Sequence, residues 1–530
     1  MDASTIQRRR WVILGVVVVG LLAIVIDNTV LNVALKTIAN PVGGLGASQS
    51  QLEWAINSYT LVFAGLLFTF GVLGDRIGRK RMLIAGLVLF GIGSLLSAYS
   101  HSPDQLIAAR AAMGLGGAAV MPQTLSIISN VFEPQERARA IGIWASAVGI
   151  GVAIGPVLGG LLLAHFWWGS VFLINVPVTM LGAAAVLFLV PESRNPAPGK
   201  IDYLGVLGSI VGLVLLVYGI VQGGDGASWT SAGVLGPALG GLLVLGLFAW
   251  YESRIDHPSL DVRLFRDRRL SASVGAIALL FFGFGGVYFF TSFYMQNVRG
   301  YTPLIAGLLT VPFALGQFVM APRSASLVTR HGARAVVLGG MLVSALAIGG
   351  YASVGTASPI WILAVLFAVQ GAGVGVAMPA ATAAVMDVLP RERAGAGSAL
   401  TNTARQVAVA LGVAVLGSIL AQSYRGTMSP TLDRLPAGAR DTAGQSISAT
   451  QAVAGHLGHA GQFLLDPANV AFVDAMRITA LVAAGIAVLG GLVVMRWMPG
   501  RQRPNIEELV AAEVAAAERE LAAERELSER

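Results

Sequence analysis

The chain has 530 residues, of which 55% are apolar and only 12% are charged, and its mean hydropathy is +0.73. A soluble chain carries about 25% charged residues, so this one cannot cover a water-facing surface and is expected in a lipid bilayer. It has no cysteine, which excludes disulfide frameworks, catalytic thiolates and cysteine-ligated metal centres. The net charge of +7 is interpreted as loop charge beside a membrane, not as a surface for nucleic acid.

Long apolar stretches define the predicted architecture. A helix needs about 20 apolar residues to cross the hydrocarbon core, and the fourteen stretches of this kind predict an all-α integral membrane protein. They lie at residues 11–34, 53–73, 82–100, 105–128, 139–163, 169–190, 203–222, 232–251, 270–296, 303–328, 334–354, 358–386, 396–421 and 472–496. The first follows three arginines, but its apolar run is too long for a signal peptide, so a retained helix is predicted.

The basic residues predict the orientation. If the N-terminus is cytoplasmic, the cytoplasmic segments carry 27 of the 35 Lys and Arg and the outer segments carry 6, while Arg110 and Arg405 lie within spans. Such an asymmetry sets orientation during insertion, so both termini are expected in the cytoplasm. The excess of Arg over Lys, with abundant Ala, Gly and Val, favours a GC-rich genome, and a bacterial inner membrane is the expected location.

An internal repeat indicates two related halves. At an offset of 257, Gly114, Gly116, Met121 and Pro122 recur as Gly371, Gly373, Met378 and Pro379, and at an offset of 254, Arg76 and Gly78 recur as Arg330 and Gly332. Parallel repeats of this type occur in secondary transporters, whose substrate site lies near the midplane between the halves.

The repeat predicts the division of the chain. Two six-helix halves, 1–200 and 255–500, are joined by two inserted helices in 201–254. The second half contains a long outer loop, 422–471. A solvated cytoplasmic helix is expected at 501–530.

Motifs in chain order resemble one family. They are the pattern from Asp27 to Leu35, the loop Gly71-Val-Leu-Gly-Asp75-Arg76-Ile-Gly78-Arg79, the group Arg110, Gly114 and Gly116, the group Gly151, Gly155, Pro156 and Gly159, and the run from Trp168 to Pro177. As a set they resemble the fourteen-span drug/proton antiporter branch of the major facilitator superfamily. Within that branch, the sequence Trp-Gly-Ser-Val-Phe that begins at Trp168 is most similar to the quaternary-ammonium exporters. One departure is Lys36, where the family usually has Pro.

The resemblance implies a transporter and not an enzyme. It implies the major facilitator fold, alternating access, and export of hydrophobic, often cationic drugs in exchange for protons, with the proton gradient as the only energy source and no cofactor. No Gly-x-x-x-x-Gly-Lys-Ser/Thr phosphate loop is present, which argues against direct use of ATP. A monomer is expected.

Asp27 is the first candidate for proton coupling. An ionised carboxylate at the centre of a spanning helix costs about 2.5–3.5 kcal/mol, so it is normally neutral, paired or exposed to an aqueous cavity. Counting about 1.5 Å per residue places Asp27 and Arg110 at similar depths, where they could meet. A proton carrier and a fixed ion pair between two helices both remain open. The resemblance implies a proton-coupling role for both residues.

Other polar residues are candidates for the substrate cavity. Asn28 and Asn32 lie one turn apart and either line the cavity or bond to neighbouring helices. Asn57 is neutral where quaternary-ammonium exporters often carry an acid, and Glu53 is expected to be a solvated residue at a helix end. Cation-π contacts suggest Tyr59, Trp144, Tyr288 and Tyr294, and the branch's Arg-Gln pair is matched by Arg405 and Gln406, with structural and functional roles equally open.

Two motifs are candidates for conformational gates. In the first loop motif, Gly71 to Arg79, Asp75 is expected to begin the third span and cap its backbone N–H groups. The resemblance adds a cytoplasmic lock formed with Arg76. In the second, Gly151, Gly155 and Gly159 form a small-residue face that allows close helix packing, while Pro156 kinks the helix.

Three alternatives follow from the same residues. The chain could export a single endogenous antibiotic, lipid or siderophore. It could be a membrane enzyme, but this needs acids or His clustered at one membrane face, and here they are scattered. His456 and His459 on the outer loop could bind metal, although an unrelated solvated pair is the expected reading and no metal site is predicted.

Overall fold

The computed structural model describes residues 3–194, 202–224, 228–256, 258, 261–388 and 394–498. Its helices, in chain order, are α1 (Ala3–Ala39), α2 (Gln49–Ile77), α3 (Arg79–Ala98), α4 (Pro103–Val131), α5 (Pro134–His165), α6 (Ser170–Leu173), α7 (Asn175–Leu189), α8 (Tyr203–Gly224), α9 (Ala232–Glu252), η1 (Val262–Arg266), α10 (Arg268–Phe293), η2 (Tyr294–Val298), α11 (Pro303–Leu308), α12 (Val311–His331), α13 (Ala333–Gly350), η3 (Tyr351–Ser353), α14 (Ile360–Val388), α15 (Ala394–Leu432), α16 (Ala437–Ala443), α17 (Ile447–Leu457), η5 (Gly458–Leu464) and α18 (Leu465–Trp497). These residues contain no strand, so the prediction of an all-α protein is confirmed.

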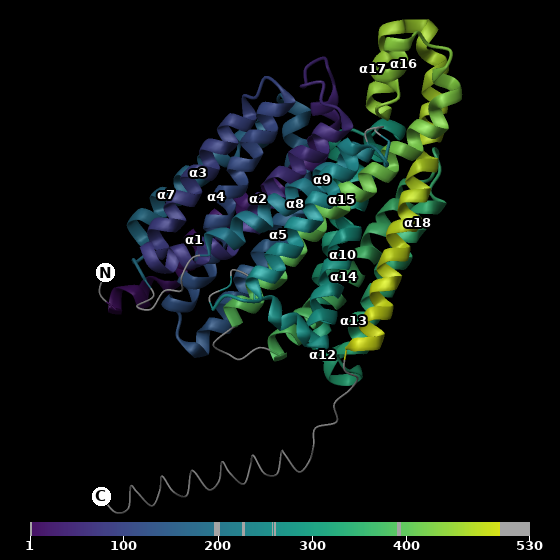
Figure 1. Cartoon of the computed structure of the whole chain (residues 1–530). Coiled ribbons are helices and arrows are strands. Elements are labelled where there is room, and N and C mark those ends of the chain that lie inside the picture. Colours follow the sequence, from purple (N-terminus) through teal and green to yellow (C-terminus); the bar gives the residue numbers. More distant parts are fainter. Residues whose placement is uncertain are drawn as a thin grey trace, which may run out of the picture.

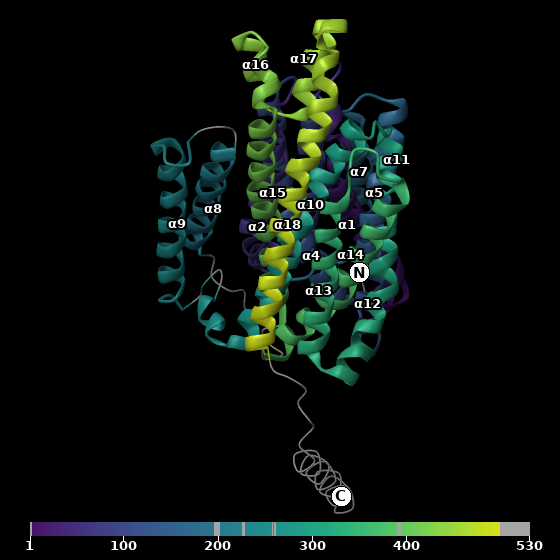
Figure 2. The same ribbon diagram turned by 90° about the vertical axis from the view of Figure 1, so that its right-hand side faces the viewer.

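The helices form two bundles that lie side by side. Figure 1 shows α1 to α7 in one bundle and α10 to α15 with α18 in the other. At one end, here called the loop end, α16 and α17 project beyond the bundles, and at the opposite end, the terminal end, α1 begins and α18 ends. The inserted pair, α8 and α9, lies at the side (Figure 2), where α8 contacts both α2 and α15.

The helices agree with the predicted spans, with one reservation about number. Each predicted stretch falls on a long helix or on a consecutive pair, such as α6 with α7. Within the described residues, 12 helices are long and apolar enough to cross a membrane, and 13 are if the two parts of α2, bent by 54°, form one span. In α5 the apolar segment Ile150–His165 is shorter than the length required of a span. A fourteenth span, at α5, therefore stays a prediction.

The predicted outer loop 422–471 is mostly helical in the structure. α15 continues to Leu432, α18 already begins at Leu465, and two short helices lie between them. Alanine-rich segments favour helix, and Ser446 caps α17 by accepting from the backbone N–H of Ala449 at 3.1 Å. The predicted tail helix, 501–530, lies outside the described residues.

The internal repeat is visible in how the helices pack. A Cβ on Gly114 of α4 would collide with the backbone oxygen of Tyr59 on α2, and a Cβ on Gly371 of α14 would collide with that of Phe313 on α12. Likewise Gly412 of α15 touches the backbone of α10, as Gly155 of α5 touches that of α1. Because glycines 257 positions apart make corresponding approaches, the two halves share one packing plan.

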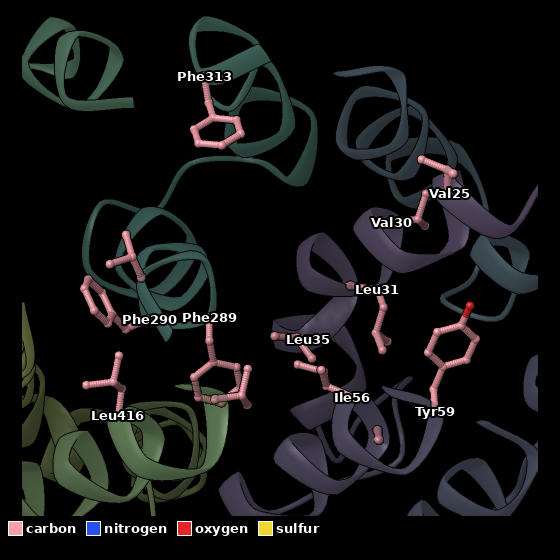
Figure 3. Close-up of a cluster of buried hydrophobic side chains, with 14 of the residues drawn as sticks. Val25, Val30, Leu31, Leu35, Ile56, Tyr59, Phe289, Phe290, Phe313 and Leu416 are labelled. Atoms are coloured by element: carbon pink, nitrogen blue, oxygen red, sulfur yellow. The ribbon is translucent and has the colours of Figure 1, made fainter. Parts of the chain in front are cut away.

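The halves are held together near the loop end. A Cβ on Gly160 of α5 would collide with the backbone of Leu304 on α11, and one on Gly307 of α11 would collide with that of Pro156. Three hydrogen bonds also join α1 to α10 and η2 here. An apolar layer lies between the two halves. Figure 3 shows Leu31, Leu35, Ile56 and Tyr59 on one side of it and Phe289 on the other, with Phe290 and Leu416 behind Phe289 in the C-terminal bundle.

Candidate functional site

Asp27 and Arg110 meet inside the N-terminal bundle. Nη1 of Arg110 donates to Oδ2 of Asp27, and the two side chains are 2% and 1% exposed. The depth count along the two helices had placed the two residues at similar depths, where they could meet. Nε of Arg110 also donates to the backbone oxygen of Ala55 at 3.1 Å. The guanidinium is therefore anchored to α2 while it pairs with α1.

Asn175 completes the environment of the carboxylate. Its Nδ2 donates to Oδ1 of Asp27 at 3.0 Å and lies 3.1 Å from Oγ of Ser94. Ser94 in turn donates to the backbone oxygen of Phe172 at 2.9 Å. Each oxygen of Asp27 thus accepts from a donor, so this arrangement suits the ionised carboxylate. The sequence motif that contains Asn175 assigned it no role; the only available signal was a polar residue within the apolar stretch 169–190.

Tyr59 connects this cluster to Asn28. The guanidinium carbon of Arg110 lies 4.4 Å from the centre of the Tyr59 ring. Nδ2 of Asn28 lies 3.2 Å from the Tyr59 hydroxyl and 2.9 Å from the backbone oxygen of Ile24, and Figure 3 shows that hydroxyl directed toward α1. Asn28 and Tyr59, both predicted for the substrate cavity, therefore lie directly beside the ion pair.

Asn32 and Tyr288 lie on either side of a small cavity between the halves. Other lining residues are Thr291 and Ser292 of α10, and Thr310 between α11 and α12. Trp144, a third predicted cavity residue, instead donates from Nε1 to Oγ1 of Thr124 on α4 at 3.1 Å. The structure brings the first two to the junction of the halves and holds Trp144 against a neighbouring helix.

Asn57 and Glu53 are both enclosed. Neither polar side-chain atom of Asn57 has a hydrogen-bond partner in the described structure. Glu53 is 1% exposed, so the expectation of a solvated helix-end residue was wrong. Its carboxylate accepts from Nε2 of Gln49 at 3.4 Å and occupies the space opposite Gly417 of α15. Asp27 is thus accompanied by a second buried acid, nearer the loop end.

The remaining cavity candidates lie in the C-terminal bundle. The hydroxyl of Tyr294 donates to the backbone oxygen of Gly355 at 2.6 Å, so its polar atom is used within that bundle. Arg405 lies over the ring of Phe281, 5.4 Å from its centre, and Gln406 follows it on α15. The structure does not bring these three residues to the Asp27 cluster.

The glycine face of α5 packs against the stretch of α1 that carries Asp27. A Cβ on Gly151 would lie 2.8 Å from Val25, and one on Gly155 would overlap Oγ1 of Thr29. Gly159 faces Val30 at 3.1 Å. Pro156, on the same helix, meets Gly307 of the other half. This face therefore fixes α5 to α1 on one side and to α11 on the other.

The loop motif at the terminal end differs from its prediction. Asp75 lies in the last turn of α2, where it forms an ion pair with Arg79 at 2.8 Å, while Arg76 is exposed. α3 begins only after Gly78, which has a φ of 127°. The expected cap by Asp75 was wrong because this glycine breaks the helix three residues later.

Glu192, and not Asp75, accepts a hydrogen bond from the N-terminal turn of α3. Its Oε1 accepts from the backbone N–H of Lys80, in the first turn of α3, at 3.1 Å. Nη1 of Arg79 reaches the backbone oxygen of Ser126 on α4 at 3.4 Å. A Cβ on Gly71 would lie 3.6 Å from Pro122 of α4. The motif therefore joins α2, α3 and α4 at the terminal end.

An apolar groove and the possible metal ligands lie outside the site described above. An apolar groove of about 320 Å³ lies within the C-terminal bundle, lined by residues of α12, α13 and α14 such as Leu327 and Val376. Among the described residues no group of three or more His, Asp or Glu could hold a metal ion. His456 and His459 belong to α17 and η5.

Comparison with known families gives one match across most of the chain. The family described as Major Facilitator Superfamily matches residues 17–413. Among curated relatives, the methyl viologen resistance protein SmvA of Salmonella typhimurium is 36% identical over 493 residues, covering 91% of this chain and 96% of the relative. The multidrug efflux pump LfrA of Mycolicibacterium smegmatis is 34% identical, covering 92% and 96%.

A further relative and a solved structure agree with this match. The multidrug resistance protein Stp of Mycobacterium tuberculosis is 33% identical, covering 91% of this chain and 90% of the relative. A bacterial homologue of the human lysosomal transporter Spinster, solved in an inward-facing conformation, has a TM-score of 0.64 at 19% identity and covers 94% of this chain and 99% of its own. At that identity the likeness concerns the fold.

Proposed function

Because the chain belongs to the Major Facilitator Superfamily and its relatives are drug efflux and resistance transporters, we propose that this multi-pass drug efflux transporter is a proton antiporter coupled through Asp27. The observation that carries the proposal is the buried pair of Asp27 and Arg110, at 1% and 2% exposure. Proton coupling, the cationic nature of the drugs and the monomeric state are parts of this proposal.

The physical reason for coupling is that a buried charge is unstable once its partner has been neutralised. Removing one partner of such a pair costs about 3–5 kcal/mol because the other charge is left uncompensated. A proton on Asp27 would strand the guanidinium of Arg110, which must then reach water or another acceptor. Protonation is thereby linked to a change of conformation, as exchange of a proton for a substrate requires.

A cationic drug and a proton compete for the same carboxylate. When Asp27 is ionised, its carboxylate pairs with Arg110, whose guanidinium also lies over the Tyr59 ring, so a cationic drug must displace this guanidinium to reach both groups. A lipophilic cation gains from both the charge and the ring, at about 0.5–2 kcal/mol for a cation-π contact. Outward release follows when a new proton reaches Asp27 from outside.

The proposed orientation puts the terminal end in the cytoplasm of a bacterial cell. It is supported by the excess of Lys and Arg in the segments at that end. The loop end, where the halves pack together, is then the outer face, and the structure corresponds to a state closed to the outside. The Asp75–Arg79 pair and the α5 glycine face are the proposed gates at the two ends.

The test uses everted membrane vesicles that carry an acidic interior. Addition of ethidium or a quaternary ammonium should dissipate the proton gradient in vesicles with the native protein, and Asp27→Asn should abolish this response. Asp474→Asn is the matched control, because Asp474 forms an exposed ion pair with Arg477 on α18. A response of Asp27→Asn equal to that of the native protein would remove Asp27 from the coupling mechanism.

A dedicated exporter of one endogenous compound is the competing function. The two are separated by expressing the chain in a strain that lacks its own pumps and measuring susceptibility to drugs of several chemical classes. Protection against several classes supports multidrug export, whereas protection against one class alone favours the dedicated exporter.

A further inference from the structure

Lys36 is a charged residue at the junction between the two halves. It lies in the last turn of α1, within the stretch Gln7–Ala39 that is apolar enough to span a membrane. Its Nζ donates to the backbone oxygen of Gln296 in η2, on the other half. None of the ion pairs found in the described part of the chain includes Lys36. Its recorded partner is thus a carbonyl group of the opposite bundle.

That carbonyl group lies at the end of a helix. The helix formed by α10 and η2 finishes with a π turn, in which the N–H of Arg299 donates to the oxygen of Tyr294 at 3.0 Å, and Gly300 then has a φ of 65°. The last four carbonyls of a helix lack intrahelical donors and form the negative end of its dipole. Gln296 belongs to this last turn, so its oxygen is a favourable acceptor for an ammonium group.

Two helix C-termini meet at this point. α1 ends at Ala39 and the α10–η2 helix ends at Val298, both near the loop end. Their negative ends would repel each other if the halves closed without a cation between them. The ammonium of Lys36 belongs to the last turn of one helix and binds the last turn of the other, so it offsets this repulsion.

Neutral hydrogen bonds reinforce the same junction. Nε2 of Gln296 donates to the backbone oxygen of Val33 at 3.0 Å, and Oγ of Ser292 donates to that of Asn32. Gln296 and Ser292 are buried. These bonds set the register of α1 against α10, while Lys36 supplies the charge that the two helix ends require.

We propose that Lys36 is a tethered cation that locks the loop end shut. When the halves are together, its ammonium bridges the C-terminal ends of α1 and η2. When the loop end opens, the bond to Gln296 breaks and water hydrates the charge. Lys36 acts by position and needs no contact with substrate or with Asp27, so the inference is independent of proton coupling.

The test measures opening directly, without drug or gradient. Because the chain has no native Cys, spin labels can be placed on Val42→Cys and Ile305→Cys, two exposed positions at the loop end on opposite halves. Distance distributions by pulsed electron paramagnetic resonance then report closed and open populations. We expect Lys36→Met to raise the open-to-closed ratio about tenfold, as for loss of a charged hydrogen bond.

Three further variants make the result specific. Lys36→Arg keeps the charge and should restore the closed population, and Lys36→Gln should behave as Lys36→Met if the latter is poorly produced. Arg434→Met removes an exposed charge at the same end and should leave the distances unchanged. An unchanged distribution in both neutral variants, or an arginine variant as open as the methionine one, would overturn the proposal. Failure of Asp27→Asn to uncouple transport would leave this result untouched.

Discussion

The guanidinium carbon of Arg110 lies 4.4 Å from the centre of the Tyr59 ring, so the cation that pairs with Asp27 also rests on an aromatic face. A desolvated contact of this kind contributes about 2 kcal/mol. Tyr59→Leu should therefore lower the initial rate of ethidium efflux by about tenfold or more, whereas Tyr59→Phe should keep most of it. Rates are measured in cells with equal protein by immunoblot. If Tyr59→Phe is as damaging as Tyr59→Leu, the hydroxyl that meets Asn28 is the important group, and not the ring.

Asn175 donates to Asp27, and its contribution should depend on the charge of that residue. A hydrogen bond to a charged group contributes about 1.5–3 kcal/mol. Asn175→Ala should lower the midpoint of thermal unfolding in detergent, but should have little further effect in an Asp27→Asn background. Asn40→Ala, which removes only an exposed hydrogen bond from the backbone N–H of Val42, is the control. Equal losses in the two backgrounds would mean that Asn175 acts only through Ser94 and helix packing.

The contact between Gly155 and Thr29 predicts a compensating pair. A Cβ on Gly155 would overlap Oγ1 of Thr29, whereas one on Gly236 of α9 meets no heavy atom within 4 Å. Gly155→Ala should reduce folded protein and efflux, and Gly236→Ala should be neutral. Adding Thr29→Ala removes the overlapping hydroxyl and should recover much of the loss. Fluorescence-detected size exclusion measures the folded fraction; a double variant no better than Gly155→Ala would place the conflict at the backbone of Ile26.

The helices and the Asp27–Arg110 pair could be predicted from sequence for the same reason. Helical rise is fixed at about 1.5 Å per residue, so sequence position converts directly into depth in a membrane. That conversion says nothing of rotation about the helix axis. Asn175 was missed because its role depends on how the break between α6 and α7 turns its side chain toward Asp27.

The errors at Glu53 and Asp75 also have physical causes. Glu53 was expected to be solvated because it lies near the end of a predicted span. Its burial depends on Gly417, a residue of α15 that sequence alone does not place beside α2. Asp75 was expected to begin the third span, but it lies in the last turn of α2, because the helix break at Gly78, with its positive φ, comes after Asp75 and not before it. Both errors concern relations that local sequence does not encode.

The shared packing plan shows where the two halves differ in chemistry. Gly155 approaches the backbone oxygen of Ile26 and Gly412 that of Phe282, so Asp27, the residue after Ile26, corresponds to Gly283. At the offset of 257, Arg110 corresponds to Phe367. The C-terminal half therefore keeps the frame but carries no ionisable group at either position. If Asp27 takes up a proton as proposed, the charge changes in the N-terminal bundle only. The C-terminal bundle keeps the fixed charge of Arg405, so the N-terminal bundle is the part whose response to the membrane potential changes with the proton.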